Sequence, residues 1–442
     1  MKQTNSFRSM VLRLALPVTL QTMLQSSFSL IDQLMIGQLG SVEVAAIGLA
    51  GKFASMFTVL LGAVAAAAGI LLAQAMGAGD KQSRNRSFCL TLMLALGLAA
   101  GFTAVCMLAP DAIMGLYSRD AATVQTAASY LRLLALSFFP MAGSALLAAL
   151  LRCMDRASLP LYAGLAAALG NTGCNYLLIF GKLGLPAMGV EGAALATALS
   201  QLLNVLILLA AMGKHGAGLG LRWELSRPGR AFWAILTPLL VTELLWSLGE
   251  NVYGVIYGRL GTEPCAAMTL LNPIQSLVMG ALSGLAQAAG ILVGKELGAG
   301  NRQEAYDRAK YLMGCGWLGS AALSVLLLLL GRAYIGLYQV EPAVRAMAWQ
   351  LMLVYAAVSP FKAQNMILGG GILRSGGKTR YVMWIDILGT WAFGVPLGLL
   401  AAFLWQLPIF WVYLLLSLEE CVRLTVSLAV FRRKGWMQRI SS

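Results

Sequence analysis

The sequence predicts an all-α integral membrane protein in which twelve transmembrane helices form two parallel six-helix lobes, related by pseudo-two-fold symmetry along the membrane normal. Three observations lead to this fold class. The chain of 442 residues is 59% hydrophobic and only 11% charged, whereas about a quarter of an ordinary soluble domain is charged. Apolar stretches near the ~20 residues that cross a bilayer as a helix recur along the chain. Sequence features also repeat at one fixed offset. Together these observations exclude a soluble enzyme.

Hydropathy, with Gly, Pro and charged residues taken as boundaries, predicts the individual helices. The first six span 10–37, 44–76, 87–109, 122–151, 159–180 and 191–212, and the second six span 232–259, 265–294, 309–330, 343–373, 381–404 and 409–431. The first helix contains Gln21, Gln25 and Asp32, so it is too long and too polar for the apolar core of a signal peptide. We expect residues 1–212 to form one lobe, 213–231 a cytoplasmic linker, 232–431 the other lobe and 432–442 a basic tail.

An internal repeat supports the division into two lobes. At an offset of 221 residues the chain matches itself without a gap over long distances. The matches include Pro17 with Pro238, Gly69-Ile70-Leu71 with Gly290-Ile291-Leu292, and Gly77-Ala78-Gly79 with Gly298-Ala299-Gly300. Because each half has an even number of helices, both halves enter the membrane from the same side and form parallel repeats. A central cavity is therefore expected between the lobes.

The basic charge points to topology rather than to nucleic acid. The net charge is +14, but 23 of the 32 Lys and Arg residues fall in the alternate intervals that share a side with the N-terminus. Basic residues collect in cytoplasmic loops. We therefore expect a multi-pass protein of the plasma (inner) membrane with both termini in the cytoplasm, a lipid bilayer around it and no nucleic-acid partner. We also expect a monomer.

Motifs for cofactor chemistry are missing from the sequence. Seven cysteines include no C-x-x-C pair, and the single histidine, His215, cannot build a metal site with several ligands. The sequence has no G-x-x-x-x-G-K-[ST] phosphate loop, so the chain carries no ATP-hydrolysing module of its own. We expect no cofactor and no resident metal, and any uphill transport would use an ion gradient.

Carboxylates within helices are the candidate functional residues, because each costs roughly 2.5–3.5 kcal/mol in the bilayer. Asp32 in the first helix is predicted to titrate or to bind a cation, rather than to serve only as a buried hydrogen-bonding acid. Glu243 and Glu250 lie seven residues apart, on one face of the seventh helix, and Asp386 lies in the eleventh. The alternative for Glu250 is an internal ion pair, and its candidate partners are Lys52, Lys362 and Arg132.

The twelfth helix carries Glu419, Glu420 and Arg423. Arg423 lies one turn beyond both Glu419 and Glu420, so we expect a helix-surface ion pair there.

Polar residues of the fifth and sixth helices suggest a partner set for Asp32. Asn171 and Asn175 are four residues apart and therefore stack on one face. With Asp32 and Thr197 they would form a small site lined by oxygen atoms, which suits a hard cation. The alternative is that these side chains only hydrogen-bond helices to one another.

Several segments resemble the multidrug and toxic compound extrusion (MATE) family over nearly the whole length. They are LPVTLQ (16–21), LLAQAMGAGDKQ (71–82) and its copy ILVGKELGAGNRQEA (291–305), LGNTGCNYLLIFGKLGLPAMGVEGAALAT (169–197), and ILRSGGKTRYVMWIDILGTWAFGVPLG (372–398). The resemblance implies an antiporter, driven by Na⁺ or H⁺, that exports cationic, amphipathic drugs by alternating access of the central cavity. A flippase for lipids or lipid-linked precursors is the alternative.

The resemblance also implies roles for particular residues. Asp32, Asn171, Asn175 and Thr197 correspond to the cation site of the first lobe, while Glu243, Glu250 and Asp386 are candidates for substrate or ion contact in the second. Pro17 and Pro238 are expected to let their helices bend. Some relatives have a second carboxylate where this chain has Asn175, so both coupling ions stay open.

Overall fold

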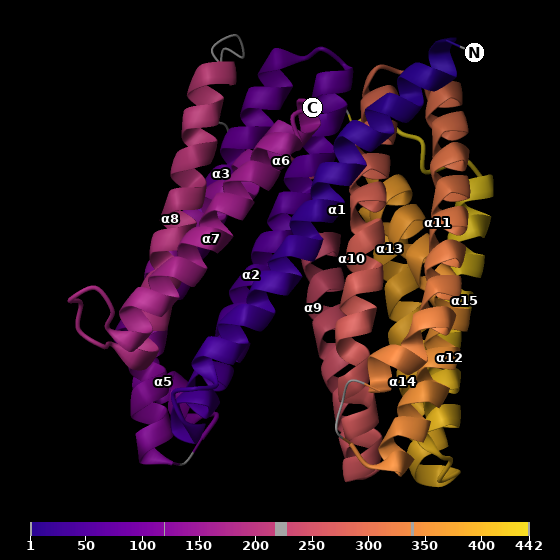
Figure 1. Cartoon of the computed structure of the whole chain (residues 1–442). Coiled ribbons are helices and arrows are strands. Elements are labelled where there is room, and N and C mark those ends of the chain that lie inside the picture. The colour runs from indigo at the N-terminus through magenta and orange to yellow at the C-terminus, as the bar shows by residue number, and fades with distance from the viewer. Residues whose placement is uncertain (1, 119, 217–227, 337–339, 441–442) are drawn as a thin grey trace. The chain divides into compact units, whose positions relative to one another are not determined.

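A computed structural model describes the chain except for residues 1, 119, 217–227, 337–339 and 441–442 (Figure 1). It is helical, and no strand occurs in the described residues. The first half contains α1 (Lys2–Ile36), α2 (Ser41–Gly77), α3 (Lys81–Leu108), the short α4 (Pro110–Gly115), α5 (Ala121–Leu134) continued through η1 (Ala135–Ser137) into α6 (Phe138–Cys153), α7 (Ser158–Phe180) and α8 (Gly189–Gly216).

The second half contains the remaining six long helices. They are α9 (Arg230–Arg259), α10 (Thr262–Gly298), α11 (Arg302–Gly336), α12 (Pro342–Asn365) continued by the π-helical η2 (Met366–Leu373), α13 (Thr379–Asp386) continued through η3 (Ile387–Gly394), α14 (Val395–Leu399) and η4 (Leu400–Leu404), and α15 (Ile409–Arg432).

All twelve predicted segments are therefore helical, but several helices are longer than hydropathy predicted. The helix α1 begins at Lys2 instead of residue 10, and α11 begins at Arg302 instead of residue 309. Hydropathy locates only the part of a helix that is apolar enough to lie in lipid. The extra turns are rich in charged and amide side chains, most of which are adequate helix formers.

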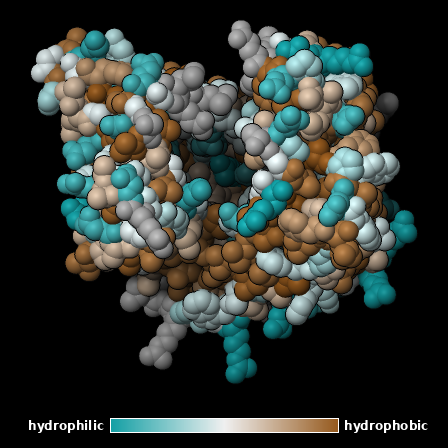
Figure 2. Space-filling model, turned by 90° about the horizontal axis from the view of Figure 1, so that it is seen from below, coloured by the Kyte–Doolittle hydropathy of each residue, from teal (hydrophilic) through white to brown (hydrophobic). Residues whose placement is uncertain are grey.

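Ten of the described helices are long and apolar enough to cross a membrane. The helix α15 is not among them, because Glu419, Glu420 and Arg423 fall within its central stretch. Many large apolar side chains are exposed, including Leu329 of α11 at 72%, and hydrophobic residues cover large parts of the surface in Figure 2. Such a surface suits contact with lipid hydrocarbon.

The contacts divide the chain into two compact units. One, called here the C-terminal unit, contains 1–19, 73–80 and 229–442, and the other, the N-terminal unit, contains 20–72 and 81–228. The start of α1 and the end of α2 thus pack with the second half of the sequence. Thr19 donates a hydrogen bond to the Ala281 carbonyl at 3.0 Å, and a side chain at Gly284 would overlap the Ala15 carbonyl. Most of the predicted linker lies outside the described residues.

The repeated Gly-Ala-Gly tripeptides have the same structural role in both halves. A Cβ atom at Gly77 would overlap the backbone of Lys295, and one at Gly298 would overlap the backbone of Gln74. Since 74 and 295 are also equivalent positions of the repeat, the ends of α2 and α10 contact each other reciprocally. The last glycine of each tripeptide, at 79 and 300, has φ of +68° and +85° and ends its helix in a left-handed turn.

Gln74 also holds the C-terminal tail. Its side-chain nitrogen donates to the carbonyls of Ser375 at 2.7 Å and Gln438 at 3.1 Å, while its oxygen accepts from the Ile440 amide at 2.7 Å. Gln74 is 3% exposed, and the tail residue Trp436 is fully buried. Residues 433–440 are therefore a packed part of the C-terminal unit.

Gln74→Leu is expected to lower the free energy of unfolding by about 1–3 kcal/mol, because three backbone groups lose a buried partner. Tryptic cleavage after Lys434 should become faster, since the tail then detaches more often. The measurement is thermal unfolding in detergent together with the rate of tail cleavage. Gln350→Leu, at an exposed position of α12, is the control and should change neither. Equal cleavage rates in the two variants would contradict the role of Gln74.

Candidate functional site

Asp32 lies against two asparagines in the N-terminal unit. It is in the last turns of α1, and Asn171 and Asn175 stack one turn apart on α7 as their spacing predicts. The Asn175 amide nitrogen donates to the Asp32 carboxylate at 3.0 Å and lies 3.1 Å from the Asn171 side-chain amide. Asn171 and Asn175 are 9% and 2% exposed. The structure therefore brings three of the four predicted residues together.

The Asn171 amide adds a second polar contact to the same carboxylate. The end of this amide that faces Asp32 lies 2.9 Å and 3.1 Å from the two carboxylate oxygens, so it is the nitrogen, which donates two hydrogen bonds, and the Asn171 oxygen lies at the other end of the amide. The buried Asn175 oxygen has no hydrogen-bond partner among the described residues. In the described part of the chain Asp32 makes no ion pair. Its charge thus lies against neutral amides, an arrangement open to a proton or a cation.

Thr197 makes no hydrogen bond to this carboxylate in the described structure. Its hydroxyl donates to the Ala193 carbonyl of its own helix, α8, at 3.0 Å. Ser200, one turn further along, lies 3.4 Å from the end of the Asn171 amide that faces away from Asp32. Sequence reasoning did not find Ser200, although its three-residue spacing from Thr197 places both near one face of α8.

The C-terminal unit contains a chain of alternating charges. The Arg374 guanidinium lies 3.3 Å from the Glu243 carboxylate of α9 and 3.9 Å from that of Asp386. The other Asp386 oxygen lies 3.8 Å from Arg423. Glu243 and Asp386, which were predicted to belong to one site, are thus linked through an arginine.

The π-helical segments position this chain of charges. Arg374 directly follows η2, and Asp386 directly precedes η3, which also contains Thr390. A π-helical turn inserts an extra residue and shifts the following side chains around the axis, and such turns are frequent at functional sites. A Cβ atom at Gly389 would overlap the side chain of Arg423. Glycine at that position therefore makes room for the guanidinium.

The predicted ion pair of α15 forms between Arg423 and Glu420, but its placement on the helix surface is wrong, because Glu419, Glu420 and Arg423 are buried, at 8%, 5% and 9% exposure. Arg423 donates to Thr390 and lies 4.0 Å from Glu420. The burial arises because α15 packs against α12 and η3. Three charged residues close together in sequence are typical of a solvent-exposed helix face. In the structure, neighbouring helices cover them.

The two glutamates of α15 have separate partners. The Tyr253 hydroxyl donates to the Glu419 carboxylate at 2.5 Å. The Asn365 amide donates at 2.8 Å to both the backbone carbonyl and the carboxylate of Glu420. One oxygen of each carboxylate thus accepts a hydrogen bond from a neighbouring side chain.

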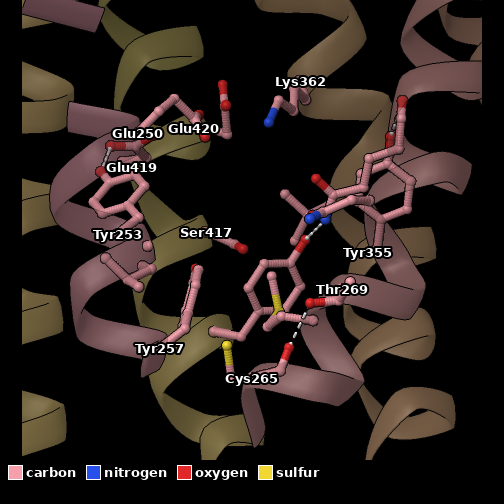
Figure 3. Close-up of a pocket in the computed structure, with 17 residues that line it drawn as sticks. Glu250, Tyr253, Tyr257, Cys265, Thr269, Tyr355, Lys362, Ser417, Glu419 and Glu420 are labelled. Carbon is pink, nitrogen blue, oxygen red and sulfur yellow. Dashed lines mark hydrogen bonds between the residues drawn. The ribbon is translucent and has the colours of Figure 1, made fainter. Parts of the chain in front are cut away.

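A cavity of about 240 Å³ lies beside these residues (Figure 3). Its walls come from α9, α10, α12 and α15. It is lined by three glutamates, one lysine, four tyrosines and smaller polar and apolar residues; the charged and aromatic ones are Glu250, Glu419, Glu420, Lys362, Tyr253, Tyr257, Tyr355 and Tyr413. A second hollow of about 520 Å³ shares part of this lining and reaches Glu243 and Asp386.

Glu250 and Lys362 both line the cavity, and the structure describes no ion pair or hydrogen bond for either side chain. In Figure 3 the Lys362 nitrogen points into the space between them. The internal ion pair considered for Glu250 is therefore not formed with any described lysine or arginine. Arg132, one of its candidate partners, instead pairs with the exposed Asp111 at 2.8 Å.

The MatE family model matches residues 17–177 and 238–400. The chain belongs to the MATE family. The second matched stretch begins 221 residues after the first, which is the offset of the internal repeat. The family consists of transporters, so this chain is a transporter and not an enzyme.

Known MATE proteins match nearly the full length. The chain is 30% identical to the probable multidrug resistance protein NorM of Bradyrhizobium diazoefficiens, over 89% of this chain and 86% of the relative. It is 28% identical to the multidrug resistance protein PmpM of Pseudomonas aeruginosa, over 88% and 82%. An outward-facing structure of a multidrug resistance MATE family transporter superposes with a TM-score of 0.87 at 19% identity, covering 97% of this chain and 96% of the other. The predicted twelve-helix, two-lobe fold is confirmed.

The prolines predicted to be hinges of this MATE protein lie inside helices. Pro17 is within α1 and Pro238 within α9. A proline removes one backbone hydrogen bond and crowds the preceding turn, which favours a bend. Their part in a conformational change stays a prediction.

Proposed function

We propose that this MATE protein is an ion-coupled antiporter that exports cationic, amphipathic small molecules by alternating access. The observation that carries the proposal is the Asp32 site, where a carboxylate that pairs with no described lysine or arginine lies among buried amides. A carboxylate in a membrane helix costs free energy on insertion, so its presence there indicates a functional role. The names of the relatives, multidrug resistance proteins, favour drug export over the flippase alternative.

The charge of Asp32 would change during the transport cycle. Either protonation or a bound Na⁺ neutralises the carboxylate, and its state biases the transporter toward one conformation. The Asn175 oxygen supports this role, because it is buried and free to accept a bond from a proton donor or to ligate a hard cation. Thr197 keeps only a supporting role in this proposal, and Asn171 orients the carboxylate.

The second-lobe carboxylates would contact substrate or a second ion. Glu250 faces the cavity directly, whereas Glu243 and Asp386 are held by Arg374 and Arg423. We propose Glu250 as the contact residue and the other two as positioning residues. The protein would act as a monomer in the plasma membrane, with both termini in the cytoplasm.

The test is efflux from proteoliposomes with a Na⁺ gradient or a proton gradient imposed alone. The proposal expects one of the two gradients to drive export of a permanent organic cation such as tetraphenylphosphonium. The sufficient gradient identifies the coupling ion. Absence of gradient-driven export, together with movement of labelled lipid between leaflets, would overturn the proposal in favour of a flippase.

A further inference from the structure

We propose that Lys310 and Lys434 form a binding site for the phosphate group of an anionic phospholipid. The site lies where α11 begins and α15 ends, on the side of the membrane that is predicted to face the cytoplasm. The two lysines line neither cavity of the C-terminal unit and have no part in the proposed transport function. A lipid site therefore goes beyond that function.

A single tyrosine ring brings the two lysines together. The Lys310 nitrogen lies 4.5 Å from the centre of the Tyr306 ring, and the Lys434 nitrogen lies 4.6 Å from the same centre. Lys310 is one turn beyond Tyr306 on α11, whereas Lys434 follows the end of α15. The attraction of each ammonium group to the aromatic ring offsets part of the repulsion between the two charges. Two positive charges from different helices are thus held around one ring.

The Tyr306 ring is itself fixed by a stack of aromatic side chains. It stacks on Phe431 with the ring centres 4.9 Å apart and the planes at 15°, and Phe431 stacks on Trp436 at 5.6 Å and 19°. Phe431 and Trp436 are buried, and the Trp436 ring nitrogen donates to the Phe431 carbonyl at 3.2 Å. Because this stack joins α11 to the packed tail, the lysines are positioned before a ligand arrives, which lowers the ordering cost of binding.

The backbone conformation of Lys434 indicates a role for its side chain. Lys434 has a φ of +57°, a left-handed conformation that is unfavourable for a residue with a Cβ atom. Glycine is the usual residue at this position just past a helix end, but here the glycine comes one residue later, at 435. Residues kept in an unfavourable backbone conformation are frequent at binding sites. A lysine in this place suits a site that needs its charge.

The surrounding charges favour an anion as the ligand. Residues 306–310 and 431–439 contain six basic residues and one acid, Asp307. Lys310 and Lys434 are exposed, and no ion pair with Asp307 or another acid is described for either. Each ammonium group carries three N–H donors, so donors remain for the oxygen atoms of a phosphate beside the contact with the ring. The negative charge of Asp307 weakens the positive field without reversing it.

The position of the site along α11 favours a lipid as the source of the phosphate. This helix is long and apolar enough to cross a membrane. Trp317 and Leu328 lie seven and eighteen residues beyond Lys310, about two and five helical turns, and therefore on the same face of the helix. They are 38% and 44% exposed. An apolar face thus leads to a lysine at the level where tryptophans and lipid headgroups lie, and acyl chains would follow this face while the phosphate contacts the lysines.

Two phospholipids with the same acyl chains test the choice of headgroup. Native mass spectrometry of the full-length protein in detergent, titrated with lipid, measures the affinity for the first bound lipid. Phosphatidylglycerol is anionic, whereas phosphatidylcholine carries an ammonium group that the lysines repel. The wild type is expected to bind phosphatidylglycerol about tenfold more tightly. Equal affinities, or a preference for phosphatidylcholine, would overturn the proposal.

Inorganic phosphate distinguishes a lipid site from a site for the free ion. Added in large excess over phosphatidylglycerol, it is expected to displace little of the lipid, because it lacks the acyl chains that contact the apolar face of α11. Complete displacement would assign the site to free phosphate and would overturn the assignment to a lipid.

Paired variants assign the headgroup preference to the two lysines. Lys310→Gln combined with Lys434→Gln is expected to weaken phosphatidylglycerol binding about tenfold and to change phosphatidylcholine binding little. Arginine at both positions should keep the preference, because a guanidinium also stacks on tyrosine and binds phosphate. The matched control is Lys81→Gln with Lys214→Gln, which removes two exposed lysines of α3 and α8 on the same predicted side of the membrane. An equal loss in the control would show a general effect of surface charge and would overturn the site.

Discussion

Replacing Asp32 with asparagine is expected to reduce gradient-driven efflux to the leak rate of protein-free vesicles. Asparagine has nearly the same shape and can still bond to Asn175, so the fold should survive. It cannot take up a proton, and it lacks the charge that holds Na⁺ between neutral oxygens. Because the ion then no longer distinguishes the two conformations, its gradient cannot shift their populations. The measurement is efflux from proteoliposomes under the gradient that drives the wild type.

Substrate binding should be nearly unaffected by the same substitution. Asp32 lies in the N-terminal unit, whereas the residues proposed to bind substrate line the cavity of the C-terminal unit. Affinity measured in detergent should therefore stay within about twofold of wild type, the scatter expected when two sites share no partner residue. Asp111→Asn, which removes an exposed carboxylate paired with Arg132, is the control and should leave efflux intact. Full efflux by Asp32→Asn would rule out Asp32 as the coupling group.

Spacing along one helix predicted the N-terminal part of the site well. Asn171 and Asn175 differ by four residues, and that separation fixes their relative position on a helix without knowledge of the rest of the fold. Thr197 was less predictable, because its contact depends on how α8 is rotated about its own axis. Successive residues of a helix are rotated by about 100°, so residues three apart, such as Thr197 and Ser200, differ by only about 60°. A modest error in the rotation of α8 therefore exchanges one for the other. Helix periodicity specifies faces, but tertiary packing decides which face meets which neighbour.

For the candidate site of the C-terminal unit, the sequence predicted which carboxylates belong to it but not how they are held. Glu243 and Asp386 were found because acids are rare in apolar helices, but their link through Arg374 depends on where η2 ends. No simple period in the sequence indicates a π-helical segment. The need for glycine at position 389 becomes clear only from the structure, where a Cβ atom there would overlap the side chain of Arg423. The charged residues of α15 were predicted to lie on the helix surface for a related reason. A hydropathy profile records how polar a segment is and does not record whether other helices surround it.

Arg423→Met is expected to lower the free energy of unfolding by about 3–5 kcal/mol, the range for removing one partner of a buried ion pair. The guanidinium is 9% exposed and lies near Glu420 and Asp386 as well as Thr390. Without it, the two carboxylates remain in an apolar environment with less compensation. Chemical unfolding in detergent, followed by tryptophan fluorescence, measures the change. Arg132→Met is the control, because its exposed pair with Asp111 should contribute only about 0–1 kcal/mol.

A second substitution distinguishes charge from packing as the cause. If the loss arises from uncompensated acids, Asp386→Asn in the Arg423→Met background should recover part of the stability, although Asp386→Asn alone destabilises the wild type by leaving two arginines with less compensation. If the loss arises from the missing bulk of the arginine, the two effects should add within about 0.5 kcal/mol, as they do for independent sites. Additive effects would therefore contradict the electrostatic role of Arg423. Coupled effects would show that the arginines of the C-terminal unit hold acids in place at the edge of its cavity.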